Sequence, residues 1–368
     1  MTLAGDLRRR GDELAPLLCE LPTPCLVADL GAVRANLRAG ANAAGALGAR
    51  LRPHAKAHKC SSLLRLQLSE EHTAGVTCAT SNEALRLARL GFGDVLVANE
   101  VVSRHGVAEL TEAARQLDRL VLAVDSETGV EAASAVAATS GREVAVLVDL
   151  DVGSGRCGVP PASDAALAVA EAAARDTGLC LEGLMGYASH ANRGTDDDRR
   201  RVAAEVKAAF EATMARLAGR GLAVSTVSGG STGMWNVDQG LTELQLGSYA
   251  LMEASYAGAL DGGPFAAALF CAATAISRPA PDRLVLDAGL KAMSAELGLP
   301  VAPDGIEPDD FSDEHLTCRV AGGAWPAVGD QVLLLPAHLD PAMNLHHRVF
   351  VLEGGAVVDE WPVDLRRD

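Results

Sequence analysis

The feature that most restricts the fold of this chain is a repeated alternation of short β-rich runs with helical runs. Segments with helical apolar spacing lie between most of the β-rich runs, which number eight. Eight strands that alternate with helices fit a closed parallel (β/α)8 barrel better than an open sheet. The predicted strands are Arg50–His54, Gly75–Ala79, Asp94–Asn99, Arg119–Val124, Glu143–Asp149, Leu181–Tyr187, Ala223–Ser228 and Leu244–Ser248.

The pattern changes after the last of these strands. From about Ala272, strand-like runs such as RLVLDAG and DQVLLLP are separated by Pro, Gly and Asp turns, and residues 22–30 also have the pattern of a strand. The first residues form a short charged helix. We therefore predict an α/β protein with a TIM-like (β/α)8 barrel at residues 31–265, and a mostly β domain formed by residues 1–30 and 266–368.

Composition limits the partners of the protein. A formal net charge of −16 and a pI near 5.0 disfavour nucleic acid, because phosphate binding needs clustered Lys and Arg. No stretch resembles a secretion signal or a membrane span. The eight cysteines are scattered without a C-x-x-C pair, which is typical of reduced thiols. We expect a cytoplasmic protein that acts on a small molecule and binds neither nucleic acid nor membrane.

A basic segment, RPHAKAHKC, stands directly after the first predicted strand. Lys56 lies just past the strand end, among Arg52, His54 and His58. The working residues of such a barrel stand at the carboxyl ends of its strands. A partly buried lysine among cations has a lowered pKa and can form a Schiff base with a carbonyl. The alternative is an ordinary charged surface loop.

Small residues follow the seventh and eighth predicted strands, in SGGSTG and LGSY. Glycines let backbone N–H groups approach a phosphate and hydroxyls add donors, and the phosphate site of such barrels is usually in these loops. Two flexible turns are the alternative. The predicted phosphate-binding residues are Ser228, Gly230, Ser231, Thr232, Gly247, Ser248 and Tyr249.

Two motifs match other protein classes. The match of residues 229–233 to G-x-S-x-G would make Ser231 a hydrolase nucleophile, but the following MWNVDQGLTEL is a poor start for the helix which that motif requires. Residues 153–158 match G-x-G-x-x-G, but they lead into Val-Pro-Pro and not into a helix. We expect this segment to project Arg156 from a tight turn, while Tyr187 and His190 follow the sixth strand.

A third group, His338-Leu339-Asp340, follows DQVLLLP in the predicted β domain. In an extended segment residues two apart face the same side, so the imidazole and the carboxylate can hold one divalent ion. Two ligands make a weak site, and His346 and His347 are close enough in sequence to compete as ligands. A surface turn is the alternative.

Taken together, the motifs RPHAKAHKC, DVGSGRCGV, GYASH, SGGSTG, LQLGSY and PAHLDPAMNLHH resemble, in register, the D-threonine aldolase and D-serine dehydratase family. The resemblance covers nearly the whole chain and implies an alanine-racemase-like barrel with a β domain, the cofactor pyridoxal 5'-phosphate and a divalent metal. It implies that Lys56 holds the cofactor, with His54 shaping the pocket, and that His338 and Asp340 hold the metal.

The resemblance also implies roles for three other residues. His190 transfers a proton at the substrate hydroxyl, since imidazole suits acid–base work near neutral pH. Arg156 and Tyr187 contact the cofactor ring or its phenolic oxygen. A homodimer is expected, because relatives close the active site with the partner's β domain.

The metal pair decides between the two reactions of the family. Aldolase members release glycine and an aldehyde, whereas dehydratase members, which tend to have H-x-C, release an oxo acid and ammonia. The H-x-D pair of this chain favours a D-threonine-type aldolase, with a D-serine or 3-hydroxyaspartate dehydratase as the alternative. Its carboxylate favours Mn²⁺ or Mg²⁺, with Zn²⁺ and Co²⁺ as alternatives.

Departures from the family pattern bear on substrate choice. Glu253 stands where an aspartate is usual, and Met234-Trp235 follows the glycine loop where smaller residues are expected. A non-catalytic cofactor-binding protein and a Ser231 hydrolase are the remaining alternatives.

Overall fold

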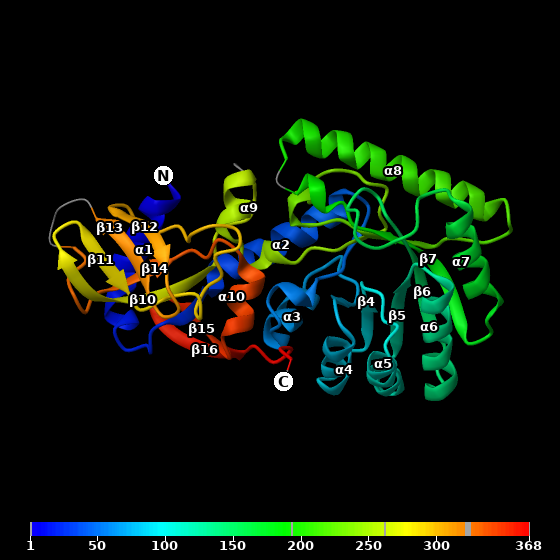
Figure 1. Cartoon of the computed structure of the whole chain (residues 1–368), viewed down its shortest axis with the longest axis horizontal. Helices are drawn as coiled ribbons and strands as arrows, with labels where there is room; N and C mark the ends of the chain where they lie inside the picture. The colour runs from blue at the N-terminus through cyan, green and yellow to red at the C-terminus, as the bar shows by residue number, and fades with distance from the viewer. Residues whose placement is uncertain (1, 193, 261–262, 321–324, 368) are drawn as a thin grey trace. The chain divides into compact units, whose positions relative to one another are not determined.

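The computed structural model describes residues 2–192, 194–260, 263–320 and 325–367, and the chain divides into two compact units (Figure 1). The barrel unit comprises Arg38–Lys56, Ser61–Gly247 and Asp364–Asp368. The β unit comprises Met1–Leu37, Ala57–Cys60 and Ser248–Val363. The domain bounds expected from the sequence, 31–265 against the two flanking stretches, stay a prediction.

Eight parallel strands form the sheet of the barrel unit, in the order β2-β9-β8-β7-β6-β5-β4-β3. Parallel bridges from Leu51 to Thr73 and from His54 to Thr77 join β2 to the chain beside β3, so the sheet closes on itself. All eight predicted strands are confirmed. They are β2 (Arg50–Leu51), β3 (Val76–Cys78), β4 (Asp94–Val97), β5 (Arg119–Val124), β6 (Val144–Leu150), β7 (Leu179–Gly186), β8 (Thr226–Gly229) and β9 (Glu243–Leu244).

Four successive helices of this unit begin with the same capping device. The hydroxyls of Thr80, Ser103, Ser126 and Ser163 each accept a hydrogen bond from the backbone N–H three residues further on. Each cap satisfies a backbone N–H in the first turn and so fixes where its helix begins. The helices are α3 (Ser61–Leu68), α4 (Ser81–Arg89), α5 (Arg104–Gln116), α6 (Glu127–Ser140), α7 (Asp164–Arg175) and α8 (Asp196–Ala218), preceded by α2 (Leu30–Ala46), which begins in the β unit.

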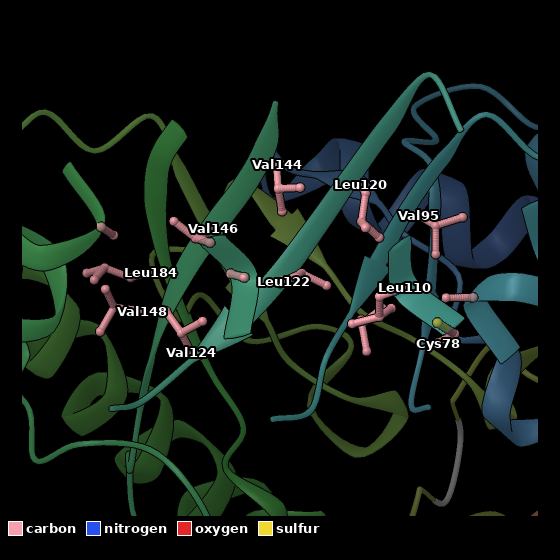
Figure 2. Packing of buried hydrophobic residues seen from close by; sticks show 14 of the residues in the cluster. Cys78, Val95, Leu110, Leu120, Leu122, Val124, Val144, Val146, Val148 and Leu184 are labelled. Atoms are coloured by element: carbon pink, nitrogen blue, oxygen red, sulfur yellow. The ribbon is translucent and has the colours of Figure 1, made fainter. Parts of the chain in front are cut away.

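The side chains of the strands alternate between two apolar layers. On β5, Leu120, Leu122 and Val124 belong to the large cluster between strands and helices, seen in Figure 2, whereas Val121 and Ala123 belong to a separate small cluster. This period of two is the pattern of a barrel strand buried on both faces.

The β unit is built from both ends of the chain. Strand β1 (Cys25–Asp29) pairs antiparallel with β10 (Leu269–Ala280) and parallel with β15 (Arg348–Glu353), as the sequence predicted for residues 22–30. The predicted N-terminal helix is also confirmed. The other elements are α1 (Leu3–Leu18), α9 (Ala254–Ala259), β11 (Arg283–Leu286), β12 (Ile306–Phe311), β13 (Leu316–Val320), β14 (Gln331–Leu334), α10 (Leu339–Leu345) and β16 (Ala356–Pro362).

Two further findings concern the described residues as a whole. None of their helices is long and apolar enough to cross a membrane. None of the eight cysteines lies in a disulfide within the described part of the chain.

Candidate active site

Lys56 lies in a short 3-10 turn, η1 (Ala55–Ala57), just past the carboxyl end of β2. The backbone before it is fixed from two sides, because His54 N donates to Leu246 O at 2.8 Å and His54 bridges to Thr77. Ala55 is fully buried, whereas the Lys56 side chain is exposed. The turn therefore presents an amine at the end of the barrel where the sequence placed it.

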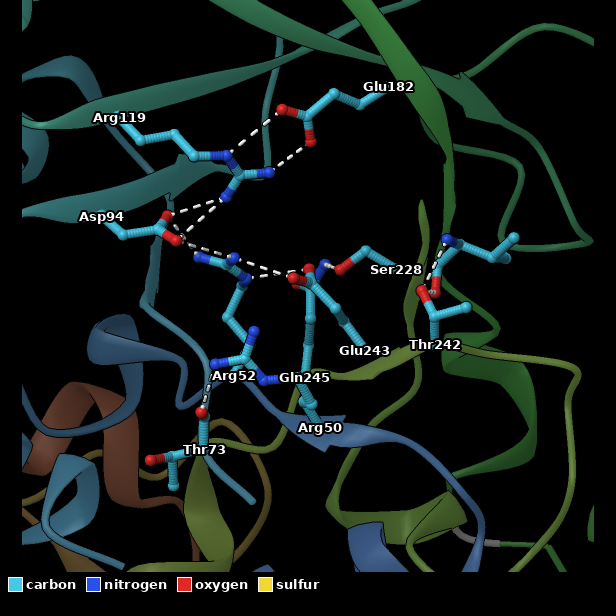
Figure 3. Close-up of polar contacts among 11 residues, drawn as sticks. Arg50, Arg52, Thr73, Asp94, Arg119, Glu182, Ser228, Thr242, Glu243 and Gln245 are labelled. Atoms are coloured by element: carbon cyan, nitrogen blue, oxygen red, sulfur yellow. Dashed lines mark hydrogen bonds and ion pairs between the residues drawn. The ribbon is translucent and has the colours of Figure 1, made fainter. Parts of the chain in front are cut away.

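Arg52 does not act as the cationic neighbour that the sequence suggested for Lys56. Its side chain is 1% exposed and donates to both Glu243 oxygens at 2.8 Å and to Asp94 at 2.9 Å (Figure 3). Burial opposes its charge, yet Glu243 and Asp94 raise the pKa of Arg52 above its ordinary value. Asp94 also pairs with Arg119, which pairs with Glu182. The charge of Arg52 is thus neutralised in the barrel interior.

Three predicted residues from three different loops are connected through Tyr187 and Asn192. Arg156 lies over the Tyr187 ring, 5.4 Å from its centroid. Asn192 Nδ2 donates to the Tyr187 hydroxyl at 2.8 Å, and Ser231 Oγ donates to Asn192 Oδ1 at 2.5 Å. Asn192 is 4% exposed, so these bonds are shielded from water. Sequence reasoning missed Asn192, whose only signal is its place two residues after His190.

The loop after β8 needs its glycines for close packing. A Cβ on Gly229 would lie 2.3 Å from the Gly186 carbonyl oxygen, and one on Gly233 would lie 2.4 Å from the backbone carbonyl oxygen of Asn192. Gly230 has a φ of 85°, which favours glycine. A 3-10 turn, η3 (Thr232–Met234), follows Ser231, so the helix of a hydrolase elbow is absent from this described segment.

The hydroxyls predicted for the phosphate site differ in their surroundings. Ser231 and Thr232 are buried beside this tight loop. Ser228 Oγ accepts a hydrogen bond from Gln245 Nε2 at 2.9 Å. Gly247 ends the second loop, and the chain then enters the β unit. There Ser248 begins a short turn, η4 (Ser248–Ala250), and Tyr249 is fully buried with its ring 5.7 Å from that of Phe265.

His190 rests on the loop that matched a dinucleotide motif. A Cβ on Gly153, which has a φ of 109°, would lie 2.7 Å from His190 Cε1. Asp151 Oδ1 accepts hydrogen bonds from the N–H groups of Gly153 and Gly155 at 3.0 Å. Backbone N–H groups, that of Gly155 first, hold the pKa of Asp151 below its ordinary value although burial opposes this. Gly153 therefore makes room for the imidazole of His190.

A group of carboxyls lies beside Arg156. Burial and the adjacent Glu100, which shares a hydrogen bond with it, raise the pKa of Asp149 to about 8. Asp125 acts in the same direction and Arg156 opposes it. Asp125 Oδ2 also accepts the Gly158 N–H at 3.2 Å. The barrel unit thus holds a carboxyl here that stays protonated near neutral pH.

Three metal-ligand residues converge in the β unit. Ligand atoms of Glu253, His338 and Asp340 all lie within 4.8 Å of one another, and His338 Nε2 is 3.9 Å from Asp340 Oδ1. The expected extended segment is wrong: His338 is the N-cap of α10 and Asp340 lies in its first turn. The two side chains still face each other. His346 Nε2 instead pairs with the Ala292 carbonyl at 2.9 Å.

Glu253 has a side chain of a kind that binds metals, and the sequence did not predict that it lies beside His338 and Asp340. It is 1% exposed, and its Oε2 accepts the N–H of Leu339, between the two predicted ligands, at 2.7 Å. Its Oε1 accepts the Ser255 hydroxyl at 2.5 Å. One imidazole and two carboxylates, one of them deeply buried, are a donor set that fits a divalent ion.

Comparison with known proteins extends this description. A family model described as the alanine racemase N-terminal domain matches residues 28–254, and one described as a putative serine dehydratase domain matches residues 268–352. The D-threonine aldolase of Arthrobacter sp is 38% identical over 367 residues, which cover 97% of this chain and 94% of that protein. The chain belongs to the D-threonine aldolase and D-serine dehydratase family.

Other members of the family agree with this assignment over nearly the whole chain. A 3-hydroxy-D-aspartate aldolase of Paracoccus denitrificans is 35% identical over 360 residues, covering 94% of this chain and 92% of that protein. The solved D-threonine aldolase of Filomicrobium marinum has a TM-score of 0.90 at 34% identity, covering 95% of this chain and 96% of that one. The predicted family and the alanine-racemase-like fold are confirmed.

Proposed function

We propose that this protein is a lyase, dependent on pyridoxal 5'-phosphate and a divalent metal, that cleaves D-threonine-type β-hydroxy-α-amino acids to glycine and an aldehyde. The observation that carries the proposal is the convergence of His338, Asp340 and Glu253 in a chain of this family. An all-nitrogen-and-oxygen donor set suits a hard divalent ion that binds a hydroxyl oxygen.

Most of the proposed cofactor residues belong to the barrel unit. Lys56 holds the cofactor, and His54 shapes the pocket beside it. The loop after β8 binds its phosphate through Ser231, Thr232 and the backbone at Gly230, a place where added Cβ atoms would not fit. When bound, pyridoxal phosphate supplies a conjugated ring that accepts electrons from Cα. The other proposed contacts are Ser228, Gly247, Ser248 and Tyr249 in the two loops, with Arg156 and Tyr187 facing the ring.

The proton of the substrate's β-hydroxyl goes to His190 in this proposal. Imidazole exchanges protons near neutral pH, and the Gly153 contact fixes the place of the ring. His338, Asp340 and Glu253 hold the divalent ion, which supplies a Lewis acid to the β-oxygen when bound. Loss of the hydroxyl proton favours breakage of the Cα–Cβ bond, which releases the aldehyde.

The metal-site carboxylates support the aldolase over the dehydratase. Asp340 stands where dehydratase members tend to carry a cysteine, and Glu253 adds a second carboxylate. Oxygen ligands favour Mn²⁺ or Mg²⁺ over the thiophilic Zn²⁺. We expect Mn²⁺ or Mg²⁺ to restore activity to chelator-treated enzyme more fully than Zn²⁺ does.

The proposal includes a cytoplasmic homodimer acting on a small molecule, as the family resemblance implies. The active enzyme should sediment with about twice the 37.9 kDa of the chain. A fully active monomer would contradict the dimer and leave the reaction unaffected.

An absorbance and product assay tests the function. Purified protein with pyridoxal phosphate should show the visible band of a lysine-bound cofactor, which Lys56→Ala removes and the nearby control Lys59→Ala keeps. With D-threonine and Mn²⁺ the enzyme should release acetaldehyde and glycine. Release of 2-oxobutanoate and ammonia would assign the protein to the dehydratases. Absence of the band would overturn the cofactor assignment.

A further inference from the structure

A third acidic residue, Glu296, lies outside the group of Glu253, His338 and Asp340 and contacts the imidazole of His338. Glu296 Oε1 pairs with His338 Nδ1. The other ring nitrogen, Nε2, is the atom that faces Asp340 Oδ1 at 3.9 Å. Glu296 therefore approaches the histidine from the side opposite to Asp340.

The segment that carries Glu296 is fixed, although it has no regular secondary structure. It lies between β11 and β12, and the N–H groups of Leu290 and Lys291 donate to carbonyls of the following turn, at Ser312 and Asp313, at 3.0 Å. Met293 is fully buried. His346, directly after α10, has its Nε2 2.9 Å from the carbonyl oxygen of Ala292. The loop thus presents Glu296 to His338 from an anchored backbone.

The contact with Glu296 selects one form of the imidazole. A carboxylate only accepts hydrogen bonds, so His338 Nδ1 must carry the hydrogen, and in neutral imidazole the lone pair then stands on Nε2. A metal ligand needs that lone pair. Carboxylate partners of this kind orient metal-binding histidines in many proteins.

We infer that Glu296 is a positioning residue of the metal site: it holds His338 with Nε2 directed toward Asp340 and Glu253. The inference rests on the proposed function, because it concerns the same metal. Glu253 fixes the backbone of the turn through Leu339 N–H, and Glu296 fixes the ring, so the two carboxylates have separate tasks.

The expected effect follows from the exposure of Glu296. Its side chain is 55% exposed, so water competes for the contact. Loss of an outer partner of a metal-binding histidine weakens metal affinity by about 10- to 100-fold. We expect the lower end, an about tenfold weaker Kd for Mn²⁺, in Glu296→Ala.

Mn²⁺ titration of the holoenzyme, with free Mn²⁺ measured by electron paramagnetic resonance, tests the inference without an activity assay. Glu296→Gln, whose amide oxygen can still accept the Nδ1 hydrogen, should stay within about threefold of wild type. The control Glu307→Ala removes another exposed acid, paired with Arg319, and should bind Mn²⁺ as wild type does. His338→Ala marks the loss of a ligand.

The outcomes separate this inference from the proposed function. Wild-type affinity in Glu296→Ala, together with loss of binding in His338→Ala, would overturn the role of Glu296 and leave the metal site in place. Equal losses in Glu296→Ala and Glu296→Gln would also overturn it, because charge and not the hydrogen bond would then be the cause. A wild-type enzyme that binds no Mn²⁺ would instead overturn the metal assignment of the proposed function.

Discussion

Two polar clusters of the barrel unit are built in opposite ways. In the interior cluster, Arg52 lies between Glu243 and Asp94, and Arg119 lies between Asp94 and Glu182. Every charge there has an opposite charge beside it. This arrangement stabilises a fold but leaves no group with chemistry to offer.

The loop cluster, formed by residues that follow β4 to β8, lacks such balance. Asp149 and Glu100 place two carboxyls together, and the pKa of Asp149 rises to about 8. Gly153 and Gly233 leave space that any Cβ would fill. Groups with shifted pKa values, and glycines that allow close packing of side chains or backbone, are typical of places where a protein binds and transforms a ligand. The contrast separates residues that stabilise the barrel from residues that are placed to bind or transform a ligand.

The sharpest test of this contrast is Lys56→Ala. Because Lys56 is exposed, its loss should leave thermal stability nearly unchanged, with a Tm shift below about 2 °C. Turnover of D-threonine should fall by at least about 10⁴-fold, as for loss of an essential covalent group. Product assays and calorimetry check the two halves. A large fall in Tm would mean that Lys56 also holds the fold.

Arg52→Met should have the reverse effect. It leaves the buried Glu243 without its arginine and removes one of the two arginines beside Asp94, which should lower the free energy of unfolding by about 3–5 kcal/mol. Urea denaturation measures this loss. The control Arg34→Met breaks an exposed pair with Glu353 and should cost no more than about 1 kcal/mol. Equal losses of unfolding free energy in both variants would show that the interior cluster stabilises the fold no more than an exposed ion pair does.

Gly153→Ala should impair the loop cluster through His190. The added Cβ would lie 2.7 Å from the imidazole, so the ring must move, and a displacement of about 1 Å costs roughly 100-fold in kcat. Gly155→Ala is the matched control, because that residue also has a positive φ but its Cβ would meet nothing within 4 Å. Similar kcat values for the two variants would show that the ring contact is irrelevant.

The effect that is smallest at each measured step concerns Asp149, because it is spread over several pH units. Because its pKa rises from 3.8 to about 8, the folded protein binds more protons than the unfolded chain in this range, so this group's contribution to stability is lost as pH rises from 4 to 8. Asp149→Asn should reduce the slope of the free energy of unfolding against pH by at most about 1.4 kcal/mol per pH unit.

Urea midpoints at several pH values measure the slope for Asp149→Asn. Asp151→Asn is the control, since the pKa of Asp151 is lowered and its contribution is lost only as pH falls below the usual range of an aspartate. An unchanged slope between pH 5 and 8 in Asp149→Asn would show that this carboxyl ionises normally.

The sequence predicted features that repeat along the chain. All eight barrel strands were predicted from apolar runs, and Lys56, Arg156, Tyr187 and His190 were predicted as site residues because they follow strand ends. Ser231 was predicted in the same way, from its place after the seventh predicted strand.

The residues that sequence reasoning missed act through distant contacts. Asn192 meets Ser231 across 39 residues, Glu296 meets His338 across 42, and Glu253 meets Leu339 across 86. No local period records such pairs, because only the closed fold brings them together. The expectation of an extended H-x-D segment was wrong for a related reason: Pro341 follows Asp340 directly, and proline suits the first turn of a helix.

The position of β1 has a consequence for synthesis of the protein. Its partner Ala272 on β10 follows Cys25 by about 250 residues, and its parallel neighbour β15 comes later still. At about 5–20 residues per second, a ribosome needs roughly 12–50 s to reach β10 after making β1. During that interval the nascent strand has neither neighbour, while the ribosome makes the barrel sequence that lies between β1 and β10. The sheet of the β unit therefore cannot be completed until all strands of the barrel have been made.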